Sequence, residues 1–325
     1  MKAVTVKQPG GPEQLQMSEQ TQPSPDKGEV LVEVKAAAVN RTDLINRQSR
    51  NGYMKSPILG VEVAGVVVET GSDVNIDIGT PVMGLVNGGG YAEYAVMPVE
   101  RAMTIPDNLS FVEAAAIPEV FLTAYQTLFW IGKLQADEHV LIHAGGSGVG
   151  TAAIQLAKHI TGSQVITTAG SKRKLDVCKE LGADIGINYK EENFDEVVLK
   201  QTGDKGVQLI LDFIGASYWR QNLSSISVDG RWVLIGFLGG NILDNVDLMD
   251  LMSKRIQLTG TLLTPRSDAY KAALTKEFAS RTMNLFASGQ LRPIVDTVFA
   301  FNEVQYAHEH MEGNKNIGKV ILQWE

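Results

Sequence analysis

Apolar and polar residues follow two different patterns along this chain. Up to about residue 110, short alternating runs such as Glu29–Lys35 are separated by turns rich in glycine and proline, such as Pro9–Pro12. Alternation with a period of two, interrupted by turn residues every eight to twelve positions, is typical of half-buried strands. The first part of the chain is therefore expected to form a small β-barrel-like domain.

From residue 139 onward, nearly all-apolar runs alternate with helix-like segments. The expected strands lie near 139–143, 164–168, 184–188, 207–212, 231–236 and 256–262, and helices are expected near 149–160, 172–181, 193–202, 216–225 and 247–253. Apolar strands of this kind occur where helices cover both faces of a sheet. Six strands joined by helical crossovers predict an α/β fold with a doubly wound parallel six-strand sheet, a Rossmann domain.

The segments on either side of this array predict how the domains are divided. Ser110 with Glu113 three residues later is a helix-starting pair, and residues 119–132 have a helical pattern. After 263 the chain shows helices near 267–290 and 304–312 and strands near 296–301 and 319–323. Because this tail has β character again, we expect it to join the first domain. The expected domains are 1–119 with 264–325, and 120–263.

A glycine turn follows the first strand of the array and opens its first helix. Gly145 and Gly150 match the first and last positions of the G-x-G-x-x-G fingerprint, with Ser147 in place of the middle glycine. Such a turn offers backbone N–H groups and the positive end of a helix dipole to phosphate. A tight turn without ligand is the alternative. The candidate dinucleotide-binding residues here are Gly145, Gly146, Ser147, Gly148, Val149 and Gly150.

The end of the second strand of the array favours NADPH over NADH. NAD sites usually place an acidic residue about 20 residues after the glycine turn, yet no Asp or Glu occurs between Glu138 and Asp176. Gly170, Ser171 and the run Lys172–Lys174 instead offer space, a hydroxyl and positive charge to a 2′-phosphate. These cations could also be a solvated first helical turn, although the helix dipole disfavours cations there.

Composition excludes several other classes of protein. The chain of 325 residues has a net charge of −8 and one cysteine. The acidic balance disfavours nucleic acid as the main partner, and no apolar run is long enough to span a membrane. One cysteine, Cys178, allows neither an internal disulfide nor a four-cysteine zinc site. With Met1–Val6 already patterned as a strand, we expect no signal peptide and a cytoplasmic location.

Three motifs give the chain a resemblance to a known family. The run Gly60–Gly65, the turn Ala144–Gly150 and the run Asn316–Val320 resemble the medium-chain dehydrogenase/reductase superfamily, and within it the zinc-free quinone oxidoreductases. The zinc branch has a cysteine where this chain has Asn40, and Gly-His-Glu where it has Gly60-Val61-Glu62. The resemblance implies a GroES-like first domain, no metal, and a homodimer that pairs through the edge strand near 256–262.

The resemblance also implies a site in the cleft between the two domains. It suggests Asn40 and Tyr53 on the substrate side, and Thr123 with the loop Phe237, Leu238, Gly239 near the nicotinamide. It assigns the phosphates, ribose and adenine to Ser147, Gly170, Ser171, Lys174, Tyr189 and Asn316.

Each of these assignments has a structural alternative. Tyr53 could be a surface aromatic residue, Asn40 a buried hydrogen-bonding residue, Thr123 a helix residue bonded to a carbonyl, and Tyr189 an aromatic residue at a sheet edge.

Three functions remain open at this point. The first is an NADPH-dependent quinone reductase that transfers hydride to a small-molecule quinone without a metal. The second is an NADPH-dependent enone or enal C=C reductase, because the same hydride geometry serves both reactions. The third is a non-enzymatic NADPH-binding protein with a structural or RNA-binding role.

Overall fold

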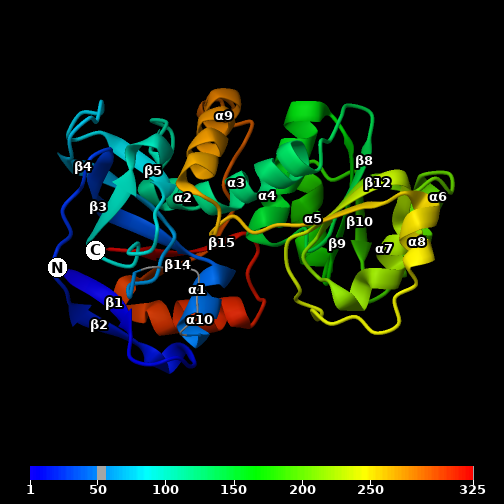
Figure 1. Ribbon diagram of the computed structural model, residues 1–325, viewed down its shortest axis with the longest axis horizontal. Coiled ribbons are helices and arrows are strands. Elements are labelled where there is room, and N and C mark those ends of the chain that lie inside the picture. Colours follow the sequence, from blue (N-terminus) through cyan, green and yellow to red (C-terminus); the bar gives the residue numbers. More distant parts are fainter. Residues whose placement is uncertain (50–55, 325) are drawn as a thin grey trace. The chain divides into compact units, whose positions relative to one another are not determined.

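The chain folds into two compact units, and the first of them is built from two separate segments of the sequence. The computed structural model describes residues 1–49 and 56–324. The first unit contains Met1–Leu122 and Leu263–Glu325, and the second contains Thr123–Leu262. The two ends of the chain, blue and red in Figure 1, thus belong to one unit. Within the described residues, no helix is both long and apolar enough to cross a bilayer.

The long strand β3 (Glu29–Val39) organises the first unit. It pairs with β4 (Glu62–Thr70) on one edge, and on the other edge with β6 (Tyr94–Pro98) and β15 (Lys319–Gln323) along its two halves. One strand therefore connects the start of the chain to its end. The described residues of this sheet form the order β14-β15-β3-β4-β5-β7, with β6 paired to β3. The remaining strands are β5 (Pro81–Leu85), β7 (Met103–Thr104) and β14 (Val295–Ala300), beside the separate pair β1 (Lys2–Val6) and β2 (Leu15–Glu19).

Helices of the first unit begin where the sequence has capping residues. α2 (Phe111–Ala115) has Ser110 as its N-cap, and the Ser110–Glu113 pair forms the predicted capping box. α9 (Asp268–Ala287) begins after Ser267, whose side chain accepts the N–H of Tyr270. The other helices are α1 (Arg41–Gln48), α3 (Pro118–Tyr125, which continues into the second unit) and α10 (Val304–Glu312).

The second unit is the predicted Rossmann fold. Its residues are all described, and its six parallel strands lie in the order β10-β9-β8-β11-β12-β13. This order, 3-2-1-4-5-6 within the array, is that of doubly wound dinucleotide-binding sheets. The strands are β8 (His139–Ile142), β9 (Gln164–Ala169), β10 (Ile185–Asn188), β11 (Val207–Asp212), β12 (Ile226–Leu234) and β13 (Gln257–Gly260). The helices between them are α4 (Gly148–Leu156), α5 (Lys172–Glu180), α6 (Phe194–Gln201), α7 (Trp219–Ser225) and α8 (Leu248–Lys254).

One strand of this sheet differs from the expectation. β12 begins at Ile226, whereas the apolar pattern predicts a start at residue 231. The register of β12 against β11 shifts near its start, and Asp229 has a positive φ of 61°. A side-chain period read from the sequence misses this part of the strand, because an irregularity interrupts the period of two.

A row of buried polar groups runs through the core of the first unit. Arg47, Asp43, Tyr91 and His308 are all 0% exposed. The His308 Nδ1 atom lies 3.1 Å from Nη1 of Arg47, and the Tyr91 hydroxyl lies 3.3 Å from both His308 Nε2 and an oxygen of Asp43. Since a guanidinium only donates, His308 accepts at Nδ1 and carries its proton on Nε2. The hydrogen bonds thus run from Arg47 to the Asp43 carboxylate.

This arrangement predicts that His308 makes the first unit less stable in acid. Burial, with the charge of Arg47 adding to it, lowers the pKa of His308 to about 3, whereas the unfolded value is about 6.5. The unfolded chain binds more protons between these values, so this contribution to stability is lost as the pH falls through that window. From pH 7.5 to 5 the linkage relation gives a loss of about 2 kcal/mol.

We expect His308→Gln to remove that loss, because a glutamine amide accepts from Arg47 and donates to Tyr91 but has no titrating group. Urea unfolding followed by tryptophan fluorescence at pH 7.5 and 5 measures the difference. His159→Gln, at an exposed histidine, should retain the pH dependence of the wild type. The same pH dependence in all three proteins would contradict the prediction.

Candidate dinucleotide site and buried lysine cluster

The glycine turn has the geometry of a strand that passes directly into a helix. Ala144 adopts a positive φ of 51°, and α4 begins at Gly148, one residue before the expected range. The Ser147 hydroxyl accepts the N–H of Gly150 at 3.0 Å, and a Cβ on Gly150 would lie 2.4 Å from the Ala144 carbonyl oxygen. The missing side chain at Gly150 thus lets the helix start against the strand end, which is the usual role of the third glycine in a dinucleotide turn.

Lys174 and Tyr189 lie against the glycines of this turn and of the next strand end. A Cβ on Gly146 would lie 3.0 Å from Cδ of Lys174, and one on Gly170 would lie 2.6 Å from the Tyr189 hydroxyl. Ser171 caps α5 by accepting the N–H of Lys174. The structure therefore brings together Gly146, Gly170, Ser171, Lys174 and Tyr189, as the sequence predicted for residues of one binding site.

The neighbouring cation Lys172 behaves differently. It is exposed and forms an ion pair with Asp176 at 2.8 Å, one helical turn away. The two lysines of the run therefore have different surroundings. Lys174 lies along the glycine turn, and Lys172 pairs with a residue of its own helix.

The loop Phe237–Gly239 follows the fifth strand of the same sheet. Its backbone is held by the loop after β11, since Leu238 and Gly239 donate to the carbonyls of Phe213 and Ile214 at 3.0 and 2.7 Å. The side chains of Phe237 and Leu238 remain 56% and 58% exposed. Two exposed apolar side chains on a fixed loop provide a surface for an apolar ring.

The other predicted site residues have these positions. Thr123 is buried at the start of the second unit, and its carbonyl accepts the hydroxyl of Thr127 at 2.8 Å. Asn40 and Asn316 belong to the first unit. Asn316 donates to the carbonyl of Gly318 at 2.7 Å. Tyr53 lies outside the described residues.

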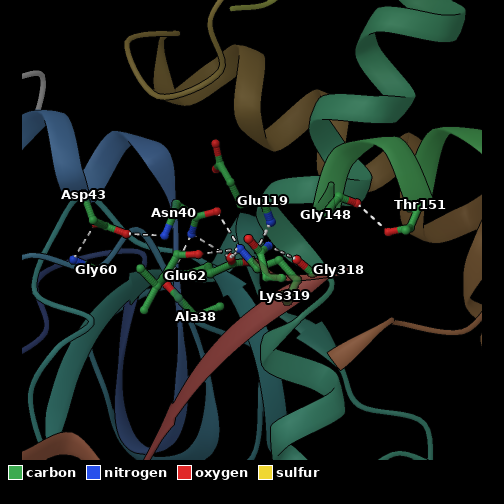
Figure 2. A network of polar contacts seen from close by, with 12 residues as sticks. Ala38, Asn40, Asp43, Gly60, Glu62, Glu119, Gly148, Thr151, Gly318 and Lys319 are labelled. Carbon is green, nitrogen blue, oxygen red and sulfur yellow. Dashed lines mark hydrogen bonds and ion pairs between the residues drawn. The ribbon is translucent and has the colours of Figure 1, made fainter. Parts of the chain in front are cut away.

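Asn40 is part of a buried cluster around Lys319 (Figure 2). The Lys319 ammonium donates to the Val39 carbonyl at 3.0 Å and to the Asn40 side-chain oxygen at 2.6 Å, and it lies 2.9 Å from a carboxylate oxygen of Glu62. Asn40 in turn donates from Nδ2 to Glu62 at 2.8 Å and to Ala38 at 3.3 Å. An ammonium has three protons, and these three contacts use all of them. The amide of Asn40 is thereby held in one orientation.

Glu119 also contacts this cluster. Its backbone N–H donates to the second carboxylate oxygen of Glu62 at 2.7 Å, while its side chain extends away from the cluster (Figure 2). Burial and then the charge of Glu62 raise the pKa of the half-buried Glu119 carboxyl to about 8.

The residues of this cluster do not fit a zinc ion. Structural and catalytic zinc sites use thiolates, neutral imidazoles and carboxylates, and here an ammonium lies 2.9 Å from the Glu62 carboxylate. Lys319 has no lone pair while it is charged, and an amide is a poor ligand for zinc. Cys178, in the second unit, has its thiol pKa raised to about 12 by burial.

Reasoning from the sequence did not single out Lys319 or Glu119. Lys319 lies in the run Asn316–Val320, one of the three motifs that carry the family resemblance. A signal was therefore present, but the partners of this side chain come from segments far away in the sequence.

Comparison with known proteins agrees with the fold. The family descriptions "Alcohol dehydrogenase GroES-like domain" and "Zinc-binding dehydrogenase" match residues 26–107 and 148–279. The chain is 30% identical over 331 residues to the quinone oxidoreductase of Homo sapiens, covering 99% of this chain and 97% of that protein. It is 33% identical over 300 residues to a segment of Highly-reducing polyketide synthase 1 of Aureobasidium melanogenum, covering 90% of this chain but only 13% of that protein.

A solved structure extends this likeness to three dimensions. The Escherichia coli quinone oxidoreductase complexed with NADPH superposes with a TM-score of 0.90 at 30% identity, covering 99% of this chain and 100% of that one. A two-unit fold with a GroES-like barrel and a dinucleotide-binding sheet defines an oxidoreductase class. The chain belongs to the medium-chain dehydrogenase/reductase superfamily, with quinone oxidoreductases among its relatives.

Proposed function

We propose that this protein is an NADPH-dependent quinone reductase that works without a metal. The observation that carries the proposal is the position of Lys174 along Gly146, at a strand end that has no acidic residue. A 2′-phosphate needs a cation and free space at that point, whereas a ribose 2′-OH is held by a carboxylate. The likeness to the E. coli quinone oxidoreductase with NADPH supports the same cofactor class.

The residues proposed to hold the cofactor fall into three groups. The turn Gly145–Gly150 would face the pyrophosphate with the start of α4. Gly170, Ser171, Lys174 and Tyr189 would receive the adenosine half and its 2′-phosphate. Phe237, Leu238 and Gly239 would lie by the nicotinamide, and Asn316 would help to hold the phosphates, ribose and adenine. When bound, NADPH supplies the hydride.

Quinone reduction suits a protein that lacks a Lewis acid. An electron-poor ring accepts hydride without the carbonyl polarisation that zinc gives to alcohols and ketones, so the protein's main task is to hold the two rings at reacting distance. We propose Asn40 and Tyr53 as the residues on the substrate side, and Thr123 as a residue near the nicotinamide. The contacts of Asn40 with Lys319 and Glu62 favour a role in shaping the site, because both amide protons are already donated within the cluster.

Within the quinone oxidoreductases, we propose the zinc-free branch, and the p53-inducible quinone oxidoreductase as the member that this sequence resembles. The mismatch of Asn40, Val61 and Lys319 to zinc ligands supports the zinc-free assignment. The single buried cysteine is consistent with the expected cytoplasmic location.

A substrate panel tests the proposed reaction. We expect NADPH oxidation with 1,2- and 1,4-quinones, unchanged after dialysis against EDTA, because no step uses a metal. Activity only with enones or enals would show the C=C reductase instead. Binding of NADPH without turnover of any acceptor would leave the non-enzymatic alternative. Activity that EDTA abolishes and zinc restores would contradict metal independence.

Lys174 provides a direct test of the cofactor preference. A charge-assisted hydrogen bond contributes roughly 1.5–3 kcal/mol, so Lys174→Glu should weaken NADPH binding by at least about tenfold and leave NADH binding nearly unchanged. Fluorescence titration of both cofactors measures the effect.

Lys172→Glu is the matched control, because it makes the same charge change two residues away at a lysine that is exposed and paired with Asp176. Equal losses of NADPH affinity in the two variants would point to a long-range charge effect and contradict a specific contact at Lys174.

We further propose a homodimer through β13. This strand is at the edge of its sheet, and all four of its residues are exposed. Leu258 within the strand is 40% exposed, and Leu262 just after it is 44% exposed. An exposed apolar edge strand pairs readily with a second copy across a two-fold axis.

Light scattering should therefore give the mass of a dimer for the wild type and of a monomer for Leu258→Arg. Ile78→Arg, at an exposed apolar side chain of the first unit (66% exposed), should remain dimeric. A monomeric wild type at micromolar concentration would contradict the proposal.

A further inference from the structure

A continuous row of buried hydrogen bonds lies under the glycine turn of the second unit. The Thr168 hydroxyl lies 3.0 Å from His143 Nδ1, and His143 Nε2 lies 2.7 Å from the side-chain oxygen of Asn222. Asn222 then donates from Nδ2 to Asp212 at 3.1 Å. None of the four residues is more than 1% exposed. Water therefore does not compete for these bonds, and each group depends on its neighbour.

The Asp212 carboxylate gives the row its direction. A carboxylate only accepts, so Asn222 presents its NH₂ group to Asp212 and its oxygen to His143. His143 must then carry a proton on Nε2. Burial lowers the pKa of His143, so the ring is neutral and Nδ1 is an acceptor. The Thr168 hydroxyl consequently donates to it. The donor–acceptor direction of each hydrogen bond is therefore fixed by the next bond in the row, and the row ends at the side chain of Asp212.

The two ends of the row hold the two halves of the proposed cofactor site. At one end, the Thr168 carbonyl accepts the N–H of Gly145 at 2.9 Å, which fixes the start of the glycine turn. At the other end, Asp212 accepts the N–H groups of Ile214 and Gly215 at 2.7 and 3.0 Å. That loop in turn receives the hydrogen bond from Gly239. The row thus joins the phosphate turn to the loop proposed to lie by the nicotinamide.

Aromatic side chains prevent the His143 ring from turning. Phe194 and Tyr218 pack edge-on against it, with ring centroids 4.8 and 4.9 Å away. The ring of Tyr218 also packs edge-on against that of Tyr189, the residue beside Gly170, with their centroids 6.2 Å apart. A change in the hydrogen bonds of His143 cannot be absorbed by rotation of its ring and must instead pass to Asn222 or Thr168.

We propose that Thr168, His143, Asn222 and Asp212 are positioning residues that couple the two halves of the dinucleotide site. Binding at the adenosine half then orders the loops 213–216 and 237–240 through this row. The inference rests on the proposed function, because it takes a dinucleotide as the ligand. None of the four residues is assigned contact with the substrate or the reacting atoms.

The row predicts a specific effect of Thr168→Val. Valine has the shape of threonine but no hydroxyl, so it leaves His143 Nδ1 buried without a donor. Valine cannot donate to that nitrogen, so the tautomer with the proton on Nε2 loses the hydrogen bond that favours it over the tautomer with the proton on Nδ1. In that second tautomer, Nε2 would face the Asn222 oxygen as a second acceptor, and Asn222 would lose its orientation toward Asp212.

Hydrogen–deuterium exchange of the full-length, ligand-free protein tests the row. In Thr168→Val, exchange at 213–216 and 237–240 should rise by at least about tenfold, the change expected when one buried acceptor loses its partner. Thr167→Val is the matched control: Thr167 is buried in the same strand, but its hydroxyl donates to the Ile142 carbonyl at 2.7 Å. It should leave exchange in these two loops within about twofold of the wild type. Thr168→Ser, which keeps the hydroxyl, should restore the wild-type rates.

Ligand binding gives the second readout. Adenosine 2′,5′-bisphosphate, which contains only the adenosine half of NADPH, should slow exchange at 237–240 in the wild type and in Thr167→Val but not in Thr168→Val. If Thr168→Val does not fold, Thr168→Ala takes its place.

Equal exchange in the Thr167→Val and Thr168→Val proteins would overturn the coupling. A wild type that binds neither NADPH nor the bisphosphate would instead overturn the proposed function, while the ligand-free exchange rates would still report on the row.

Discussion

The first unit depends on one buried ion pair, between Lys319 and Glu62. An unpaired charge in such a place costs several kcal/mol, so the ammonium and the carboxylate must both find partners, and they lie 2.9 Å from each other. Lys319 is the first residue of the C-terminal strand β15 and Glu62 the first residue of β4, with β3 between them. The pair therefore joins the two chain segments of a discontinuous unit. It also fixes the amide of Asn40.

Both units use the same device to order their buried polar groups. In each, an aspartate side chain, that of Asp43 or Asp212, accepts the last hydrogen bond of a row that passes through a neutral buried histidine. A neutral imidazole donates at one nitrogen and accepts at the other, so it transmits a direction from one neighbour to the next. Burial lowers the pKa of both histidines and thereby preserves this state. A charged histidine would donate at both ring nitrogens and would therefore break the row.

Much of the fold was accessible from local pattern. The pattern of apolar residues predicted the six-strand array with its helical crossovers, because parallel strands covered on both faces have a distinctive apolar run. The Ser110–Glu113 capping box was also predicted, since its two residues are three positions apart and need no tertiary contact. The start of β12 was missed because Asp229, with its positive φ, interrupts the period of two. The preference of a single residue for such a backbone conformation is weaker than the tertiary packing that imposes it.

By itself the sequence determined the class of each unit, the glycine turn, the absence of an acidic residue between Glu138 and Asp176, and the absence of zinc-type residues at Asn40 and Val61. These are properties of neighbouring positions, where spacing alone carries the chemistry. Only the tertiary structure decided that Lys174 rather than Lys172 lies along the turn, that Lys319 reaches Glu62 and Asn40, and that His143 joins Thr168 to Asn222. Such contacts join residues from separate strands and helices, and a buried polar group takes its partner from whatever the fold brings within hydrogen-bonding distance.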